Sequence, residues 1–327
     1  MQKNLYICTA YNDIQYILYH IVSNNNQAVI VVFSHQNLYE FLLNLKHKKI
    51  LEVKYFEFSL YNIYKSLALF KELKLISTLR KYAQGYNNFN VYTISLYFDL
   101  KSLFFLNKLS DRNNIFLFCS SDLISNFIPV KNDLKTKVLS LLYQTTFQKY
   151  NTYNTHTYGL SNSFISKKVN KYYIKNHPFS SDKMNIFKIQ PNIQGNFILF
   201  ILSNEEEKLL GAQNLDNILS TIIMNNSELK VCFKGHPRLG APLFFIGKNY
   251  FQFDLNFPIE FFDFVNCKMI IGLSSVALAN IANMNIKSYS LINFLPEENF
   301  QYKSSSIEYL NSHSNKISFP TNFNQFI

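Results

Sequence analysis

The sequence is poor in tryptophan, glycine, proline and cysteine. It has no tryptophan, and its 327 residues include only 8 glycines, 8 prolines and 4 cysteines. The cysteines lie far apart, each within or beside an apolar run, without a Cys-x-x-Cys pair or a Cys/His grouping with zinc spacing. We therefore expect free, buried thiols in a reducing compartment.

Long apolar runs are also missing, since none approaches the length of a membrane-spanning helix. The opening residues enter a strand-like run at residues 4–9 without the pattern of a secretory signal. We expect a cytoplasmic protein, with peripheral contact to the cytoplasmic face of the inner membrane as an open alternative.

Acidic residues are outnumbered by 32 Lys and Arg to 21 Asp and Glu, so the formal net charge is +11. Basic chains attract nucleic acid, anionic lipid or acidic substrates. Here the charge is spread out, and the densest run, residues 167–171, lies in a polar stretch. A solvated face is favoured over a membrane-surface or acidic-glycan patch. No nucleic-acid-binding signature accompanies the charge, so we expect no nucleic-acid partner.

What the sequence does contain is a repeated alternation of short apolar runs with amphipathic segments. Candidate strands cover residues 5–8, 28–33, 53–56, 91–96, 115–118, 197–202, 229–233 and 269–271. Helical stripes begin near residues 14, 38 and 215, a short helix is predicted over 258–264, and another helix over 274–282. This alternation predicts parallel sheets covered by helices on both faces.

The alternation weakens between about residues 148 and 194, where a domain junction is favoured over an irregular hairpin. We predict an α/β protein with two Rossmann-like domains facing a cleft, the GT-B-type architecture of nucleotide-sugar glycosyltransferases. The predicted boundaries are 1–150 for an acceptor-side domain, 151–194 for the junction and 195–327 for a nucleotide-sugar-binding domain.

The first candidate site is Lys234-Gly235-His236-Pro237-Arg238, at the end of a predicted strand. Pro237 restricts His236 to extended conformations, which holds the imidazole at the strand end. Arg238 can grip phosphate oxygens bidentately, and His236 can donate a hydrogen bond or a proton to a departing phosphate. The alternative, a structural turn whose cations face solvent, has about the same weight as a phosphate site.

The second candidate site is Gly272-Leu273-Ser274-Ser275, where two hydroxyls open a predicted helix. Simple helix capping is favoured for an isolated serine pair. Helix N-terminal amides with hydroxyls also form anion sites. The case for an anion improves because both candidate sites follow strands of one domain, where ligands of α/β sheets bind.

Carboxylates follow the first strand of the second domain at residues 205–207, and Glu260 follows Phe257-Pro258. One of the former can act as a general base, although complementing a helix dipole is favoured. Glu260 is a candidate for nucleotide sugar hydroxyls. Neither a P-loop nor G-x-G-x-x-G is present, and Gly235 and Gly240 satisfy neither pattern.

Asp-x-Asp and clustered Asp/His sets are missing as well. Many nucleotide-sugar transferases use Asp-x-Asp to hold a divalent ion on a diphosphate. We therefore expect metal-independent chemistry without a cofactor, and a nucleoside monophosphate leaving group fits because it needs less charge neutralisation.

Three motifs in order resemble the bacterial lipooligosaccharide sialyltransferase family, glycosyltransferase family 52. These are the His236 motif, Phe257-Pro258-Ile259-Glu260 and residues 272–278, and the similarity extends to residues 4–9 and 155–158. The resemblance implies that a CMP-sugar donor binds in the C-terminal domain, that His236 contacts or protonates the departing phosphate, and that Ser274 and Ser275 bind it. It also implies an inverting displacement and a homodimer.

The resemblance assigns the general base to a carboxylate after the first strand of that domain, with Glu207 first and Glu206 second. One departure is that the acidic-acidic-Gly motif of related enzymes is replaced by Cys119-Ser120-Ser121-Asp122, which leaves Asp122 as the only carboxylate there.

The expected function is transfer of sialic acid, or a related nonulosonic acid, from a CMP-sugar to a terminal sugar of a bacterial surface glycan, either lipooligosaccharide or capsule. The acceptor is then a glycan or glycolipid. Three alternatives stay open: a hexosyltransferase using a UDP-sugar, a polyol-phosphate transferase of the teichoic-acid type, and a non-catalytic glycan-binding subunit.

Overall fold

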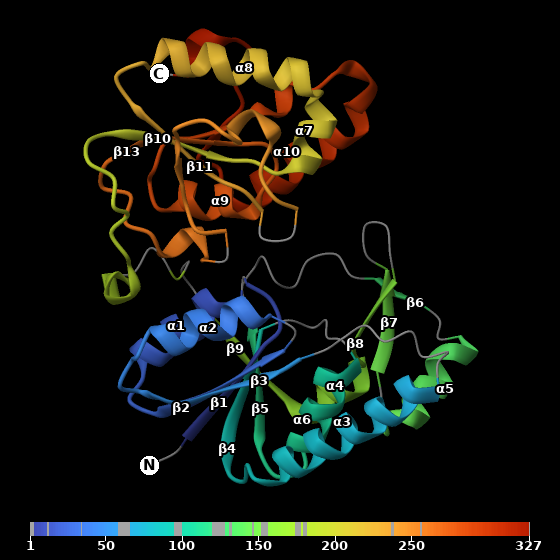
Figure 1. Cartoon of the computed structure of the whole chain (residues 1–327). Coiled ribbons are helices and arrows are strands. Elements are labelled where there is room, and N and C mark those ends of the chain that lie inside the picture. The colour runs from blue at the N-terminus through green and yellow to red at the C-terminus, as the bar shows by residue number, and fades with distance from the viewer. Residues whose placement is uncertain are drawn as a thin grey trace. The chain divides into compact units, whose positions relative to one another are not determined.

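The chain forms two compact units, Met1–Pro178 and Phe179–Ile327, whose internal structures are described separately. The computed structural model (Figure 1) describes residues 3–11, 13–33, 35–57, 66–94, 100–119, 128–130, 133–145, 147–151, 156–173, 178, 182–236, 239–255 and 257–326. The division between the units falls inside the segment 151–194 that the sequence marks as a junction.

The first unit is built on a six-stranded sheet in which neighbouring strands are all parallel. Its strands are, in spatial order, β3 (Ile50–Phe56), β2 (Gln27–Phe33), β1 (Lys3–Cys8), β4 (Phe89–Thr93), β5 (Asn114–Cys119) and β9 (Val169–Tyr173). Its helices are α1 (Asp13–Ser23), α2 (Gln36–Asn44), α3 (Ser66–Gln84), α4 (Leu100–Leu109), α5 (Leu134–Leu142) and α6 (Asn162–Lys168). The central strands β1 and β2 are apolar and almost entirely buried, as expected for parallel strands covered on both faces.

Three strands of this unit, β7 (Phe147–Asn151), β8 (His156–Leu160) and β9, lie in or at the edge of the region of weak sequence pattern. A small antiparallel sheet joins β6 (Ile128–Val130), β7 and β8. The last strand of the large sheet, β9, pairs with β5. Its sequence, VNKYY, is mostly exposed, so it lacks the apolar run by which a buried strand is predicted. The first unit therefore extends beyond residue 150.

The second unit repeats the same plan with a second six-stranded parallel sheet. In spatial order its strands are β12 (Phe251–Gln252), β11 (Lys230–Lys234), β10 (Phe197–Ile201), β13 (Cys267–Gly272), β14 (Ser288–Ser290) and β15 (Ile317–Ser318). Its helices are α7 (Asn204–Leu210), α8 (Ala212–Asn225), α9 (Val276–Asn283) and α10 (Phe300–His313). Short 3₁₀ helices include η3 (Asp182–Phe187), η4 (Leu243–Phe245), η5 (Ile259–Phe261), η6 (Leu291–Phe294), η7 (Glu297–Asn299) and η8 (Phe323–Gln325).

Both sheets place their strands in the order third, second, first, fourth, fifth, sixth, which is the Rossmann order. In the second unit α8 and α9 cover opposite faces of the sheet (Figure 1). Accordingly Ile198 and Phe200 of β10 pack in one hydrophobic cluster with α8, whereas Phe197 and Leu199 pack in another with α9. The predicted α/β class with two Rossmann-like units is confirmed.

Two further expectations concern the cysteines and the membrane. Cys8, Cys232 and Cys267 are free and buried. Within the described part of the chain, no helix is long and apolar enough to span a membrane.

Candidate functional site

The predicted site residues of the second unit gather at the carboxyl edge of its sheet. The chain leaves β10 towards α7 and α8 on one face, and leaves β13 towards α9 on the other. The adjacent ends of β10 and β13 are therefore a topological switch point, the place where open α/β sheets bind ligands. Gly272 ends β13 here, and a Cβ on it would lie 3.0 Å from the Ile201 carbonyl oxygen. Glycine thus permits the two strand ends to approach closely.

Glu206 links the two sides of this switch point. Ser203 caps α7, and its backbone N–H donates to Oε2 of Glu206 over 2.6 Å, while the Ser203 hydroxyl accepts from the Glu206 amide. This reciprocal pair is a capping box. The other carboxylate oxygen, Oε1, accepts from the Ser274 amide at 3.4 Å. Burial raises the pKa of Glu206, and the hydrogen bonds from Ser203 and Ser274 oppose that rise.

Ser274 and Ser275 take different positions at the start of α9. Ser275 is the cap residue, and its hydroxyl accepts from the Ala277 amide at 3.2 Å. Ser274 forms a 2.7 Å hydrogen bond between its hydroxyl and that of Tyr302 on α10. Both serines are half-buried at the switch point.

His236 lies in a tight loop after β11. Its backbone exchanges two 2.9 Å hydrogen bonds with Gly240, and the Leu239 amide donates to Nδ1 of its ring at 3.3 Å. Because Nδ1 accepts, the neutral ring carries its proton on Nε2. The residue is exposed, unlike Gly235 before it. A Cβ on Gly235 would lie 2.8 Å from backbone atoms of the returning segment, so the loop requires glycine there.

Glu207 points its carboxylate at the segment that follows this loop. The side chain is buried, and Oε2 accepts from the Leu243 amide at 3.1 Å. Glu206 and Glu207, the two predicted base candidates on α7, are thus both bonded to backbone amides of the second unit. Asp122, Pro237 and Arg238 lie outside the described residues.

Lys234 and Glu260 lie beside the His236 loop but face protein groups. Lys234 is buried and donates from Nζ to the Leu255 carbonyl oxygen at 2.9 Å. Burial lowers its pKa to about 8, against the opposing charges of Glu260 and Asp254. Glu260, on η5, accepts through Oε1 from the amide of Asn280 on α9 at 3.0 Å.

Two residues of this region escaped the sequence prediction. Tyr302 lies 28 residues from Ser274 and belongs to no motif, so no local signal identifies it. Asn204, the first residue of α7, has a buried Oδ1 without a hydrogen-bond partner. Its amide nitrogen lies 3.2 Å from where a Cβ on Gly240 would stand, which places it against the His236 loop. Its position directly after a strand end and Ser203 is the signal that could have identified it.

The site residues described above do not include a cluster of side chains that could bind a metal ion. Over the described ranges, no cluster of three or more His, Cys, Asp or Glu side chains is placed to hold a metal ion. The expectation of metal-independent chemistry stays a prediction.

Comparison with known proteins gives a likeness of fold. No family model and no curated protein matches the sequence. Among solved structures, the chain is similar to UDP-GlcNAc 2-epimerase from Methanocaldococcus jannaschii, at 12% identity and TM-score 0.51, over 99% of this chain and 90% of that one. It also matches UDP-GlcNAc 2-epimerase from Neisseria meningitidis (13% identity, TM-score 0.48, 98% and 95% covered) and E. coli ADP-heptose heptosyltransferase II (12%, 0.44, 98% and 90%). The chain therefore has the predicted GT-B-type fold.

The resemblance to the lipooligosaccharide sialyltransferase family was wrong. The fold is similar to that of a solved UDP-GlcNAc 2-epimerase, and no family model supports the assignment. The physical reason lies in the motifs. A histidine after one strand, a proline before a short helix and serines opening another helix are requirements of strand ends and helix starts, which many Rossmann-like units share.

Replacing Glu206 tests its role as the link across the switch point. We expect Glu206→Ala to lower the free energy of unfolding by about 1–3 kcal/mol, because the backbone amides of Ser203 and Ser274 lose their acceptor. The matched control is Glu205→Ala, which removes an exposed carboxylate from the same turn and should change stability by less than about 0.5 kcal/mol. Urea denaturation measures both, and equal effects would refute the link.

The buried Lys234 predicts a pH-dependent stability difference. An unfolded lysine has a pKa of about 10.4, so between about pH 8 and 10.4 the unfolded chain binds a proton that the folded chain lacks. The contribution of Lys234 to stability therefore rises with pH. We expect the unfolding free energy of wild type minus that of Lys234→Met to increase by about 3 kcal/mol across this window. Taking the difference cancels tyrosine and cysteine titration, and a difference that is constant with pH would contradict the prediction.

Proposed function

We propose that the protein is a glycosyltransferase that takes a hexose from a UDP-sugar and binds the diphosphate at the start of α9. The observation that carries this proposal is that the His236 loop and the Ser274–Ser275 helix start follow β11 and β13, the two strands that flank β10, at the carboxyl edge of one parallel sheet. Helix N-terminal amides and hydroxyls attract phosphate oxygens, and the helix dipole favours negative charge there.

The roles of individual residues follow from their contacts. His236, whose Nδ1 accepts a backbone hydrogen bond, would donate from Nε2 to the departing phosphate. Ser274 and Ser275 would donate to phosphate oxygens. Glu260, held by Asn280, would accept from hydroxyls of the nucleoside. Lys234 and Gly235 would shape the loop, with Pro237 and Arg238 as predicted phosphate contacts.

Glu206 and Glu207 are proposed as positioning residues. The Glu206 carboxylate fixes Ser274, and that of Glu207 fixes Leu243 behind the His236 loop. Both therefore act through backbone groups of the second unit. Asp122 stays a predicted candidate for the base that deprotonates the acceptor.

Uracil is proposed as the base of the donor nucleotide because the solved epimerase with this fold acts on UDP-GlcNAc. The same likeness favours a second candidate, epimerisation of a UDP-sugar at the hexose. Both reactions use the same nucleotide site, and they differ in whether an acceptor is needed. We propose that neither needs a divalent ion, because the sequence has no Asp-x-Asp motif.

Calorimetric titration with UDP tests the site. We expect wild type to bind UDP more tightly than CMP or ADP, and His236→Ala to bind it at least about tenfold more weakly, since a hydrogen bond to a charged oxygen is lost. His47→Ala is the matched control, because His47 also accepts a backbone amide on Nδ1, at 3.3 Å, but lies in the first unit. Absence of UDP binding, or an equal loss of UDP affinity in both variants, would contradict the proposed donor site.

Turnover separates the two reactions. UDP release from a UDP-hexose that depends on added glycan acceptor and survives chelation with EDTA is the expected result. Conversion of UDP-GlcNAc to another UDP-sugar without an acceptor would replace transfer by epimerisation. Binding of UDP without either reaction would favour a non-catalytic subunit.

A further inference from the structure

Helix α5 of the first unit has apolar side chains both on the face that packs against the core and on a neighbouring face that is exposed. Leu139 and Leu142 pack against the hydrophobic core of the unit. Leu134, Val138 and Leu141 instead face solvent, with 77%, 56% and 79% of their surface exposed. Their spacing of four and three residues places them in one stripe along the helix. The outer face of a surface helix is ordinarily polar, so an exposed apolar stripe there is a candidate contact surface.

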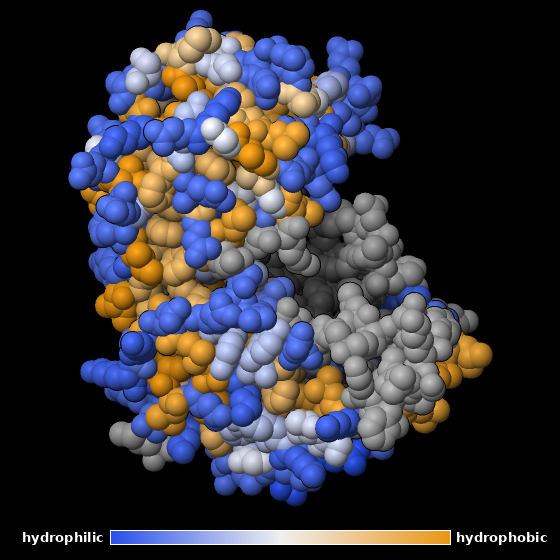
Figure 2. Space-filling view, viewed as in Figure 1, coloured by the Kyte–Doolittle hydropathy of each residue, from blue (hydrophilic) through white to orange (hydrophobic). Residues whose placement is uncertain are grey.

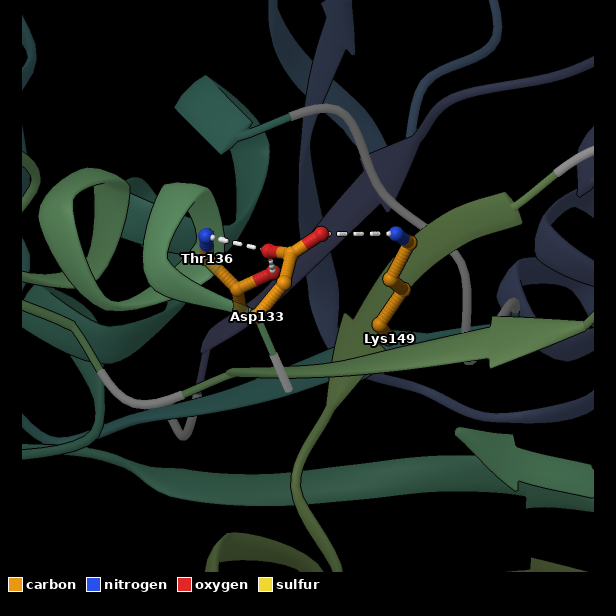
Figure 3. A network of polar contacts seen from close by, with 3 residues as sticks. All are labelled: Asp133, Thr136 and Lys149. Atoms are coloured by element: carbon orange, nitrogen blue, oxygen red, sulfur yellow. Dashed lines mark hydrogen bonds and ion pairs between the residues drawn. The ribbon is translucent and has the colours of Figure 1, made fainter. Parts of the chain in front are cut away.

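The helix that carries the stripe is held firmly at both ends. Asp133 caps it by accepting from the amide and the hydroxyl of Thr136, both at 2.8 Å, and pairs with Lys149 of β7 at 3.0 Å (Figure 3). These donors hold the pKa of Asp133 below its usual range. Beyond the other end, Arg80 of α3 donates to the side chain of Gln144 at 2.9 Å. These contacts join the start of α5 to β7 and the residue beyond its end to α3.

The sequence around the stripe is basic. The helix contains Lys135 and Lys137 and no acidic residue, and Lys137 is exposed. Across residues 128–149 the sequence has four lysines against one acid, and that acid, Asp133, is already paired with Lys149. Figure 2 shows hydrophobic residues at the surface of the region where Figure 1 places α5. Apolar side chains flanked by lysines match a lipid surface, in which anionic headgroups cover an apolar layer of acyl chains.

We propose that α5 docks on an anionic phospholipid surface, with Leu134, Val138 and Leu141 inserted at the boundary of headgroups and acyl chains. Lysine stems can extend along the apolar layer and keep their ammonium groups at the level of the phosphates. A second copy of the chain fits less well, because pairing two α5 stripes would bring lysines against lysines. The inference does not depend on the donor nucleotide.

Flotation with lipid vesicles tests the docking surface. We expect wild type to float with vesicles of phosphatidylcholine and phosphatidylglycerol, more weakly at high salt, and poorly with phosphatidylcholine alone. The triple variant Leu134→Ser, Val138→Ser, Leu141→Ser should partition at least about tenfold more weakly, since three apolar side chains no longer leave water. The matched control is Met224→Ser with Val265→Ser, which are 68% and 75% exposed in the second unit and should leave flotation unchanged.

Three results would overturn the inference: wild type that stays unbound with anionic vesicles, a triple variant that floats as well as the control, or a wild-type dimer that only the triple variant dissociates. The last would assign the stripe to contact between copies. Circular dichroism checks that the variants fold. UDP titration of the triple variant keeps the two proposals apart, because we expect nucleotide affinity to be unchanged while lipid binding is lost.

Discussion

The switch point of the second unit depends on one carboxylate, that of Glu206. At the switch point the chain leaves β10 and β13 towards opposite faces of the sheet, so the segments that follow these two strands diverge. Glu206 joins them by accepting from the Ser203 and Ser274 amides. A buried carboxylate is costly unless it receives such hydrogen bonds, and the raised pKa of Glu206 records that cost. The helix start at α9, and with it the proposed phosphate site, takes its position from this contact.

The first turn of α7 contacts two segments that lie far along the chain. Glu206 reaches Ser274 across 68 residues of sequence, and the adjacent Glu207 reaches Leu243 across 36. The first turn of α7 therefore fixes both the serine pair and the segment behind His236. Acidic residues at this turn complement the helix dipole as well, so local and long-range electrostatics agree.

Much of the second unit could be predicted from sequence, because β10, β11 and β13 are apolar runs of ordinary length and Ser275 is a typical helix cap. Strands such as β12, β14 and β15 could not, since two or three residues give no periodicity. The direction of Glu206 and Glu207 was equally hidden, because their partners lie far along the chain. Tyr302 and the outer stripe of α5 are likewise visible only once the helices are packed. The mistaken family resemblance shares this origin: short motifs report strand ends and helix starts, and those recur in unrelated families.

We propose that the start of α9, positioned by Glu206, holds the diphosphate of a nucleotide sugar. A crystal structure of the protein with UDP bound is the decisive experiment. We expect phosphate oxygens within hydrogen-bonding distance of Ser274 or Ser275, with the His236 ring beside them. Ordered UDP bound elsewhere, with these residues making no contact to it, would refute the proposal.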